Sequence, residues 1–201
     1  FNKKSMDMDV EEETDGSVTV LVMYDDHWDA LWALRVPSKG ATPEAVKWCC
    51  EKLEDSGYSG VKIAIKTDQE VSIVDLRRAV SARRLGETVP LSSPVRCSQA
   101  NRRMENAVKR FQGQLRVLKI YSENGIRKYM ALDSVMLTWL ISWVSESLSK
   151  FKVGEDGKTS YERATGHKCK HPVYGFGESI IWQKKWLVSS YIFDLFGRIR
   201  S

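Results

Sequence analysis

The sequence predicts an α/β fold in which a five-stranded mixed sheet is flanked by helices. One observation is a series of short segments rich in β-branched and aromatic residues and separated by Gly, Asp and Ser. Another is a set of longer segments in which apolar residues recur every three or four positions, as in amphipathic helices. Between residues 42 and 91 the two patterns alternate, which is typical of a sheet that contains parallel strands.

Three strands are predicted at the start of the chain, over Ser5–Val10, Val18–Tyr24 and Ala30–Val36. The segments Thr14–Ser17 and Asp25–His27 supply the turn residues between them. Because the connections are short, an antiparallel meander is expected.

Two helices and two further strands are predicted to alternate after the meander. A helix starts at Thr42, where a capping residue precedes Pro43, and runs to about Ser56. A strand over Gly60–Ile65, a helix over Glu70–Arg83 and a short strand over Glu87–Leu91 follow. The inward-facing helix positions are Val46, Cys49, Cys50 and Leu53, then Ile73, Leu76 and Val80. A helix separates the strand at 60–65 from the meander, so this strand is expected to lie parallel to the first one.

Two long helices complete the predicted core, over Gln99 to about Tyr121 and about Met130 to Phe151. The second is apolar on much of its circumference and is expected to pack deeply, with an interface between copies of the chain as the alternative. Its most apolar stretch is too short to span a bilayer, so no membrane role is expected. We expect residues 1–152 to form the core, 153–182 an extension and 183–201 an atypical tail. The first residue is Phe, which suggests a piece of a longer polyprotein.

Basic residues concentrate in the middle of a chain whose net charge is +5. They are Arg77, Arg78, Arg83, Arg84, Arg102, Arg103, Lys109, Arg110, Arg116 and Lys119. Clustered bases favour a polyanionic partner such as DNA, because they release counterions from a phosphate backbone. The alternative is a set of solvated helix faces. The four cysteines do not form the framework of a secreted disulfide-rich protein, so an intracellular location is predicted.

Carboxylates are the candidate catalytic groups. Asp68 lies three residues after the apolar strand segment that ends at Ile65, and Glu105 lies in the first turns of a long predicted helix. Asp7 and Asp9 share one face of the first predicted strand, and either could complete the set. Three carboxylates from two strands and a helix suit a two-metal phosphoryl-transfer site.

These residues carry a resemblance to a known family. The segments Lys66–Glu70, Ser93–Val95 and Ser98–Asn101, followed by Glu105, resemble the catalytic core of LTR-retrotransposon integrases of the copia type. The spacing from Asp68 to Glu105 is close to the one that names the DDE family. Thr159, Tyr161 and Glu162 resemble a stretch found downstream of the core in the same elements, and the resemblance spans roughly residues 5 to 182.

The resemblance implies a ribonuclease-H-like fold and an enzyme that processes DNA 3′ ends and transfers strands. Asp7, Asp68 and Glu105 would hold two Mg²⁺ or Mn²⁺ ions; Asp7 is preferred over Asp9 because Ser5-Met6-Asp7 matches the family lead-in better. The partners implied are the element ends and target DNA, and a homo-oligomer acting in the nucleus is expected.

Four residues are predicted to contact nucleic acid. Gln99 and Asn101 lie in the segment that borders the element DNA end in the family, while Lys109 and Arg116 share a helix stripe with Glu105.

The family carries Gly at the places of Arg96 and Arg102, so a catalytically decayed relic that only binds nucleic acid or a partner is the main alternative. A ribonuclease H proper is a third possibility, less favoured by the basic second half of the chain.

Overall fold

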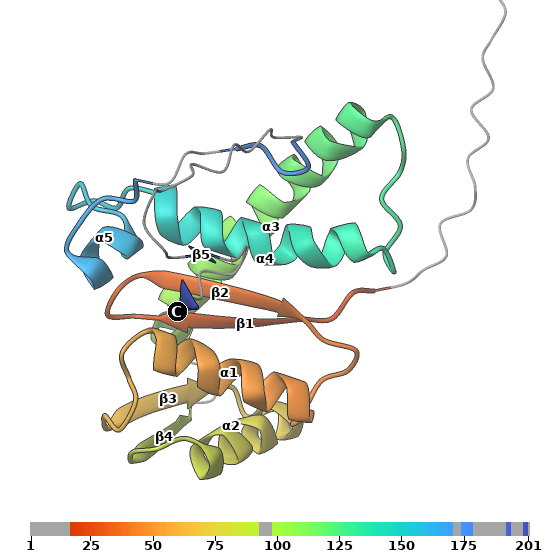
Figure 1. Ribbon diagram of the computed structural model, residues 1–201. Coiled ribbons are helices and arrows are strands. Elements are labelled where there is room, and N and C mark those ends of the chain that lie inside the picture. Colours follow the sequence, from red (N-terminus) through yellow and green to blue (C-terminus); the bar gives the residue numbers. More distant parts are fainter. Residues whose placement is uncertain (1–16, 93–97, 171–173, 179–191, 194–198, 201) are drawn as a thin grey trace, which may run out of the picture.

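The computed structural model describes residues 17–92, 98–170, 174–178, 192–193 and 199–200 (Figure 1). The predicted first strand, Ser5–Val10, lies outside these residues, and so do Asp7 and Asp9.

An antiparallel hairpin opens the described part of the fold. Strands β1 (Val20–Asp25) and β2 (Ala30–Arg35) pair from Val20 opposite Arg35 to Asp25 opposite Ala30. Side chains alternate between the two faces, as the period of a strand requires. The two meander strands predicted here are therefore confirmed, with slightly shorter bounds.

Helix α1 (Pro43–Asp55) follows the hairpin and has the ends predicted from its sequence. Its cap residue is Thr42, whose Oγ1 accepts a hydrogen bond from the amide of Ala45 at 3.2 Å. The helix ends at Asp55 with Ser56 as its C-cap residue, and Gly57 then adopts a left-handed conformation with φ of +82°.

A β-α-β unit comes next, made of β3 (Ile63–Thr67), α2 (Val71–Arg83) and β4 (Thr88–Ser92). The two strands are parallel, with Thr67 opposite Ser92 at their carboxyl ends. The predicted start of β3 at Gly60 is wrong. Gly60 has a φ of +70°, and pairing with the second strand begins at Ile63. The strand also ends two residues later than predicted, at Thr67, so Asp68 directly follows it.

Helix α3 (Ser98–Ile126) is longer than predicted, whereas α4 (Val135–Phe151) starts later than predicted. The hydroxyl of Ser134 caps α4 by accepting from the amide of Met136 at 3.1 Å. Met130, the expected first residue of this helix, is buried in the preceding turn, where Glu123 Oε1 accepts from its amide at 2.8 Å. Helix α5 (Ser160–Thr165) and a short antiparallel pair, β5 (Ile192–Phe193) and β6 (Ile199–Arg200), follow.

The hairpin lies between α1 on one face and α4 on the other (Figure 1). Two apolar clusters result. One buries Leu31 and Ala33 against α3 and α4, and its helical members are Ala107, Phe111, Leu137, Leu140, Ile141 and Val144. The other buries Val36 against α1 and α2, and its helical members are Ala45, Val46, Cys49, Cys50, Leu76 and Val80. Burial raises the pKa of the Cys49 thiol to about 12, so this thiol stays protonated.

The described strands form three separate two-stranded pairs. The five-stranded sheet therefore remains a prediction. Helix α4 is also less enclosed than predicted, because Val135 and Trp139 on its outer face are 62% and 64% exposed. Among the described helices, none has the length and apolarity needed to cross a membrane.

Candidate active site

Asp68 is exposed at the carboxyl end of β3, as predicted. Two neighbouring contacts fix this end of the sheet. Arg77 of α2 donates from Nη1 to Thr67 Oγ1 at 3.0 Å and to the carbonyl oxygen of Leu91 at 2.7 Å. The last residue of β3 and the next-to-last residue of β4 are thus held by one guanidinium group.

Glu105 is exposed near the start of α3. The segment from Ser92, the last residue of β4, to Ser98, the first of α3, can span at most about 21 Å when fully extended. Helix α3 therefore begins within that reach of the strand ends that carry Asp68. Glu105 lies seven residues further along this helix.

The remaining predicted site residues are described only in part. Asp7 lies outside the described residues, and for Gln99 and Asn101 the structure describes the backbone, which is helical, but not the side chains. Within the described part of the chain, no group of three or more acidic, His or Cys side chains is placed to hold a metal ion. The predicted ligand set is thus described for two of its three members.

The basic residues of α3 differ in their partners, and one of them, Lys119, pairs with Glu123 on the same helix at 2.7 Å. Arg103 donates to Asp26 Oδ1 at 2.8 Å and Arg110 to Asp29 Oδ1 at 3.1 Å, so both bind the hairpin turn. In contrast, Arg102, Lys109 and Arg116 are exposed, and none of them forms an ion pair with another described residue. These three recur every seven residues, which places them along one side of the helix. We call them the α3 basic row.

Asp29 is the centre of a set of charged contacts that the sequence did not reveal. Its carboxylate accepts from Tyr24 at 2.9 Å and Arg110 at 3.1 Å, and lies 3.3 Å from Lys152 Nζ and 3.8 Å from Arg163. Burial acts to raise the pKa of Asp29, but hydrogen bonds from Tyr24 and Arg110 and the charge of Lys152 lower it below its usual value. Burial and the bond to Asp29 raise the pKa of Tyr24 to about 12.

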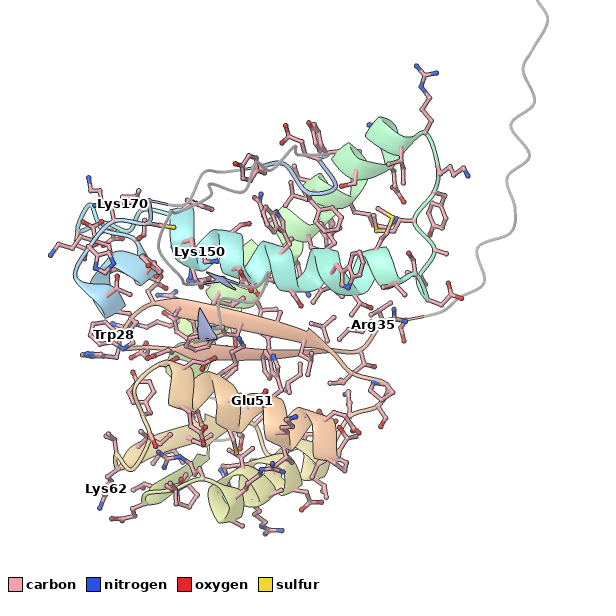
Figure 2. All side chains as sticks on the ribbon, viewed as in Figure 1. Trp28, Arg35, Glu51, Lys62, Lys150 and Lys170 are labelled. Atoms are coloured by element: carbon pink, nitrogen blue, oxygen red, sulfur yellow. The ribbon has the colours of Figure 1, made fainter. Side chains whose placement is uncertain are left out.

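Helix α5 binds the same turn. The hydroxyl of Ser160 donates to the carbonyl oxygen of Asp29 at 2.5 Å, and Arg163 Nη1 donates to that of Trp28 at 3.2 Å. Figure 2 shows Trp28 at the end of the hairpin beside α5. Arg163 is also held by Asp156, with Nη2 to Oδ1 at 2.6 Å.

These contacts give the Thr159–Arg163 segment a structural role. The basic partners of Asp26 and Asp29 lie 77 or more positions away in the sequence, beyond any local signal.

Comparisons with known proteins add to this geometry. No protein-family model matches the chain, and no curated protein matches it in sequence. Among solved structures, the catalytic core domain of BIV integrase is similar, with a TM-score of 0.51 and 16% identity, over 74% of this chain and 86% of that one.

A second similar structure is a simian T-cell lymphotropic virus intasome in complex with the PP2A regulatory subunit B56 gamma, with a TM-score of 0.52 and 14% identity. The match covers 92% of this chain and 61% of that chain. At such identities the similarity shows the fold alone. The chain thus has an α/β fold similar to that of retroviral integrase catalytic cores.

Proposed function

We propose that this protein is the integrase catalytic core of a copia-type LTR retrotransposon, which processes DNA 3′ ends and joins them to target DNA. The observation that carries the proposal is the position of Asp68, directly after β3 and at the end of the sheet from which the chain continues into α3 and Glu105. The similarity to integrase cores supports it.

The two described carboxylates fit a hard divalent cation. Both are exposed, and carboxylate oxygens are the ligands that Mg²⁺ and Mn²⁺ prefer. Asp68, Glu105 and Asp7 would hold two such ions, which when bound supply charge neutralisation at the attacking and leaving oxygens. The protein's own part is to present these carboxylates from a strand end and a helix.

The third carboxylate would come from a strand that completes the sheet. Within the described part of the fold, β1 pairs only with β2, and β3 only with β4. In the predicted five-stranded sheet, Ser5–Val10, which lies outside the described residues, would supply the fifth strand and with it Asp7.

Nucleic-acid contacts are assigned to the start and outer side of α3. We propose that Gln99 and Asn101 contact the element end and that Lys109 and Arg116 bind backbone phosphates. The absence of ion-pair partners for these two bases among the described residues supports the assignment, because their charge is not neutralised within the described fold. Arg102 extends the same row.

A homo-oligomer acting on element and target DNA in the nucleus completes the proposal. The exposed Val135 and Trp139 on α4 support an oligomer, because large apolar side chains on one helix face often mark an interface. One of the similar structures is itself an intasome.

A strand-transfer reversal assay on branched DNA with Mn²⁺ tests the enzyme. Asp68→Asn and Glu105→Gln are expected to abolish joining, because each replaces an anionic ligand by a neutral amide. Asp55→Asn and Glu51→Gln are the matched controls, since both carboxylates lie on α1, where Figure 2 labels Glu51. Equal activity in all four variants would reject the carboxylate site.

A decayed relic that only binds DNA is the second candidate. It is favoured by Arg102, which stands where the family has Gly, and by the backbone around it, which is helical from Ser98 onward. Arg does not share the backbone freedom of Gly, so this segment would be stiffer than in active relatives. An unmodified chain that is folded and binds DNA but joins no strands would establish this alternative.

A further inference from the structure

The segment around Asp68 is held from both sides. On one side, Thr67 accepts a hydrogen bond from Arg77 at 3.0 Å. On the other, Glu70 accepts from Lys39 Nζ at 3.0 Å and from Ser72 Oγ at 2.9 Å. The side chains of Lys39 and Glu70 are 61% and 48% exposed, so their ion pair holds the loop weakly.

The Arg77 contact is the stronger of the two restraints. Arg77 is half-buried between α2 and the strands, and the same Nη1 atom also donates to the carbonyl oxygen of Leu91 at 2.7 Å. Leu91 pairs with Lys66 in the parallel register, one residue before Thr67. A single guanidinium group therefore ties helix α2 to the ends of both strands. A charged donor in such a bridge binds more strongly than a neutral one.

We propose that Arg77 is a positioning residue for Asp68: through Thr67 it fixes the backbone that presents this carboxylate to a divalent cation. The inference rests on the proposed function. Its physical reason is that the affinity of a metal site depends on ligands being held in place before the ion binds, and loss of a supporting contact typically weakens metal binding about 10- to 100-fold.

Two substitutions break the bridge from opposite ends. Arg77→Ala removes the donor, and Thr67→Val removes the acceptor while keeping a β-branched side chain suited to a strand. Thr67→Ser retains the hydroxyl and should retain the bridge. Arg78→Ala is the matched control, because Arg78 is the neighbouring base on α2 and its described contact is an exposed pair with Asp75 at 3.2 Å.

The experiment titrates Mn²⁺ into the full 201-residue chain by calorimetry and measures urea unfolding of each variant alongside. Arg77→Ala and Thr67→Val are expected to weaken Mn²⁺ binding about 10-fold or more, while Thr67→Ser and Arg78→Ala stay within about twofold of the unmodified chain. The Mn²⁺ concentration that gives half-maximal strand-transfer reversal should shift in the same order. If Arg77→Ala does not fold, Thr67→Val carries the test.

Two results would overturn the inference, and they differ in whether the metal site itself is also rejected. Unchanged Mn²⁺ affinity in folded Thr67→Val or Arg77→Ala, with weaker binding in Asp68→Asn, rejects the role of Arg77 but keeps the metal site. An unmodified chain that binds Mn²⁺ no better than Asp68→Asn rejects the proposed function and the inference together.

Discussion

The hydroxyl of Ser149 in α4 binds both backbone polar groups of Leu31 in β2. It accepts from the amide of Leu31 at 3.2 Å and donates to its carbonyl oxygen at 3.0 Å. On the side of β2 away from β1, a helix side chain thus supplies the hydrogen bonds that a neighbouring strand would otherwise make. The contact joins α4 directly to the backbone of the hairpin.

Ser149→Ala is expected to destabilise the fold by about 1–3 kcal/mol, because it leaves the amide and carbonyl groups of the buried Leu31 without their partner. Urea unfolding followed by circular dichroism measures the change. Ser147→Ala is the control, since Ser147 lies on the same helix and no hydrogen bond of its side chain is seen among the described residues. Equal stability of the two variants would contradict the prediction.

Arg84 is a buried cation that binds oxygen atoms of two loops and a strand. Its guanidinium donates to the carbonyl oxygens of Tyr58 and Val61 at 2.9 and 2.8 Å, to that of Glu87 at 3.0 Å and to Thr88 Oγ1 at 2.9 Å. Arg84→Ala is expected to cost about 2–4 kcal/mol of unfolding free energy, because four oxygen atoms lose hydrogen bonds from one buried guanidinium at once. Thermal and urea unfolding check this value.

Two companion variants sharpen the Arg84 test. Arg83→Ala should change stability by less than about 0.5 kcal/mol, because Arg83 is exposed. Arg84→Lys should recover part of the loss but not all, since a single ammonium group cannot reach all these oxygens. Full recovery by Lys would show that charge, rather than the shape of the guanidinium, matters here.

Asp29 predicts a loss of stability in acid. Its pKa is lower in the folded protein than the unfolded value of about 3.9, so its contribution is present above that pH and is lost as the pH falls through the folded value. Asp29→Asn should therefore be less stable than the unmodified chain at pH 7, by about 1–3 kcal/mol. The difference should shrink below pH 4. Urea unfolding across this range measures it.

Tyr24 gives the matching test at high pH. Its pKa is raised to about 12 in the fold, from about 10 in the unfolded chain, so stability should fall as the pH rises from 10 to 12. Tyr24→Phe should remove this part of the pH dependence. An identical alkaline profile in both proteins would exclude Tyr24 as its source.

The α3 basic row predicts a salt-dependent affinity for DNA. Changing Arg102, Lys109 and Arg116 to Ala should weaken binding and lower the slope of log affinity against log salt by about 1 per residue. The control changes Lys158, Lys168 and Lys170, which are exposed around α5, and alters the net charge equally. Fluorescence anisotropy with labelled DNA at several salt concentrations compares the two. Equal slopes would place the DNA elsewhere.

Local signals in the sequence predicted several elements well. The Thr42-Pro43 pair marks the start of α1, because capping and the fixed φ of proline act within one turn. The start of α4 was missed because its apolar pattern continues back to Met130, which the fold buries in a turn instead.

Long-range contacts could not be predicted in this way. Asp29 resembles any turn aspartate in sequence, and its role follows from Arg110, Lys152 and Arg163, which tertiary structure alone brings together. For the candidate site, the placement of Asp68 at a strand end and of Glu105 on a helix was predictable, since both depend on nearby apolar patterns. The contacts of Arg77 with Thr67 and Leu91 beside this site were not predictable, because they depend on how α2 lies against both strands.

The attachment of α5 to the hairpin turn has a consequence for dissecting the chain. A protease that cuts between Lys152 and Thr159 would break one peptide bond, yet Ser160 and Arg163 would still bind the carbonyl groups of Asp29 and Trp28. The two fragments should then remain associated and copurify. A gene truncated after Lys152 would instead yield a protein in which these carbonyl groups lack their donors, so expression of a shortened form is better ended beyond Thr165.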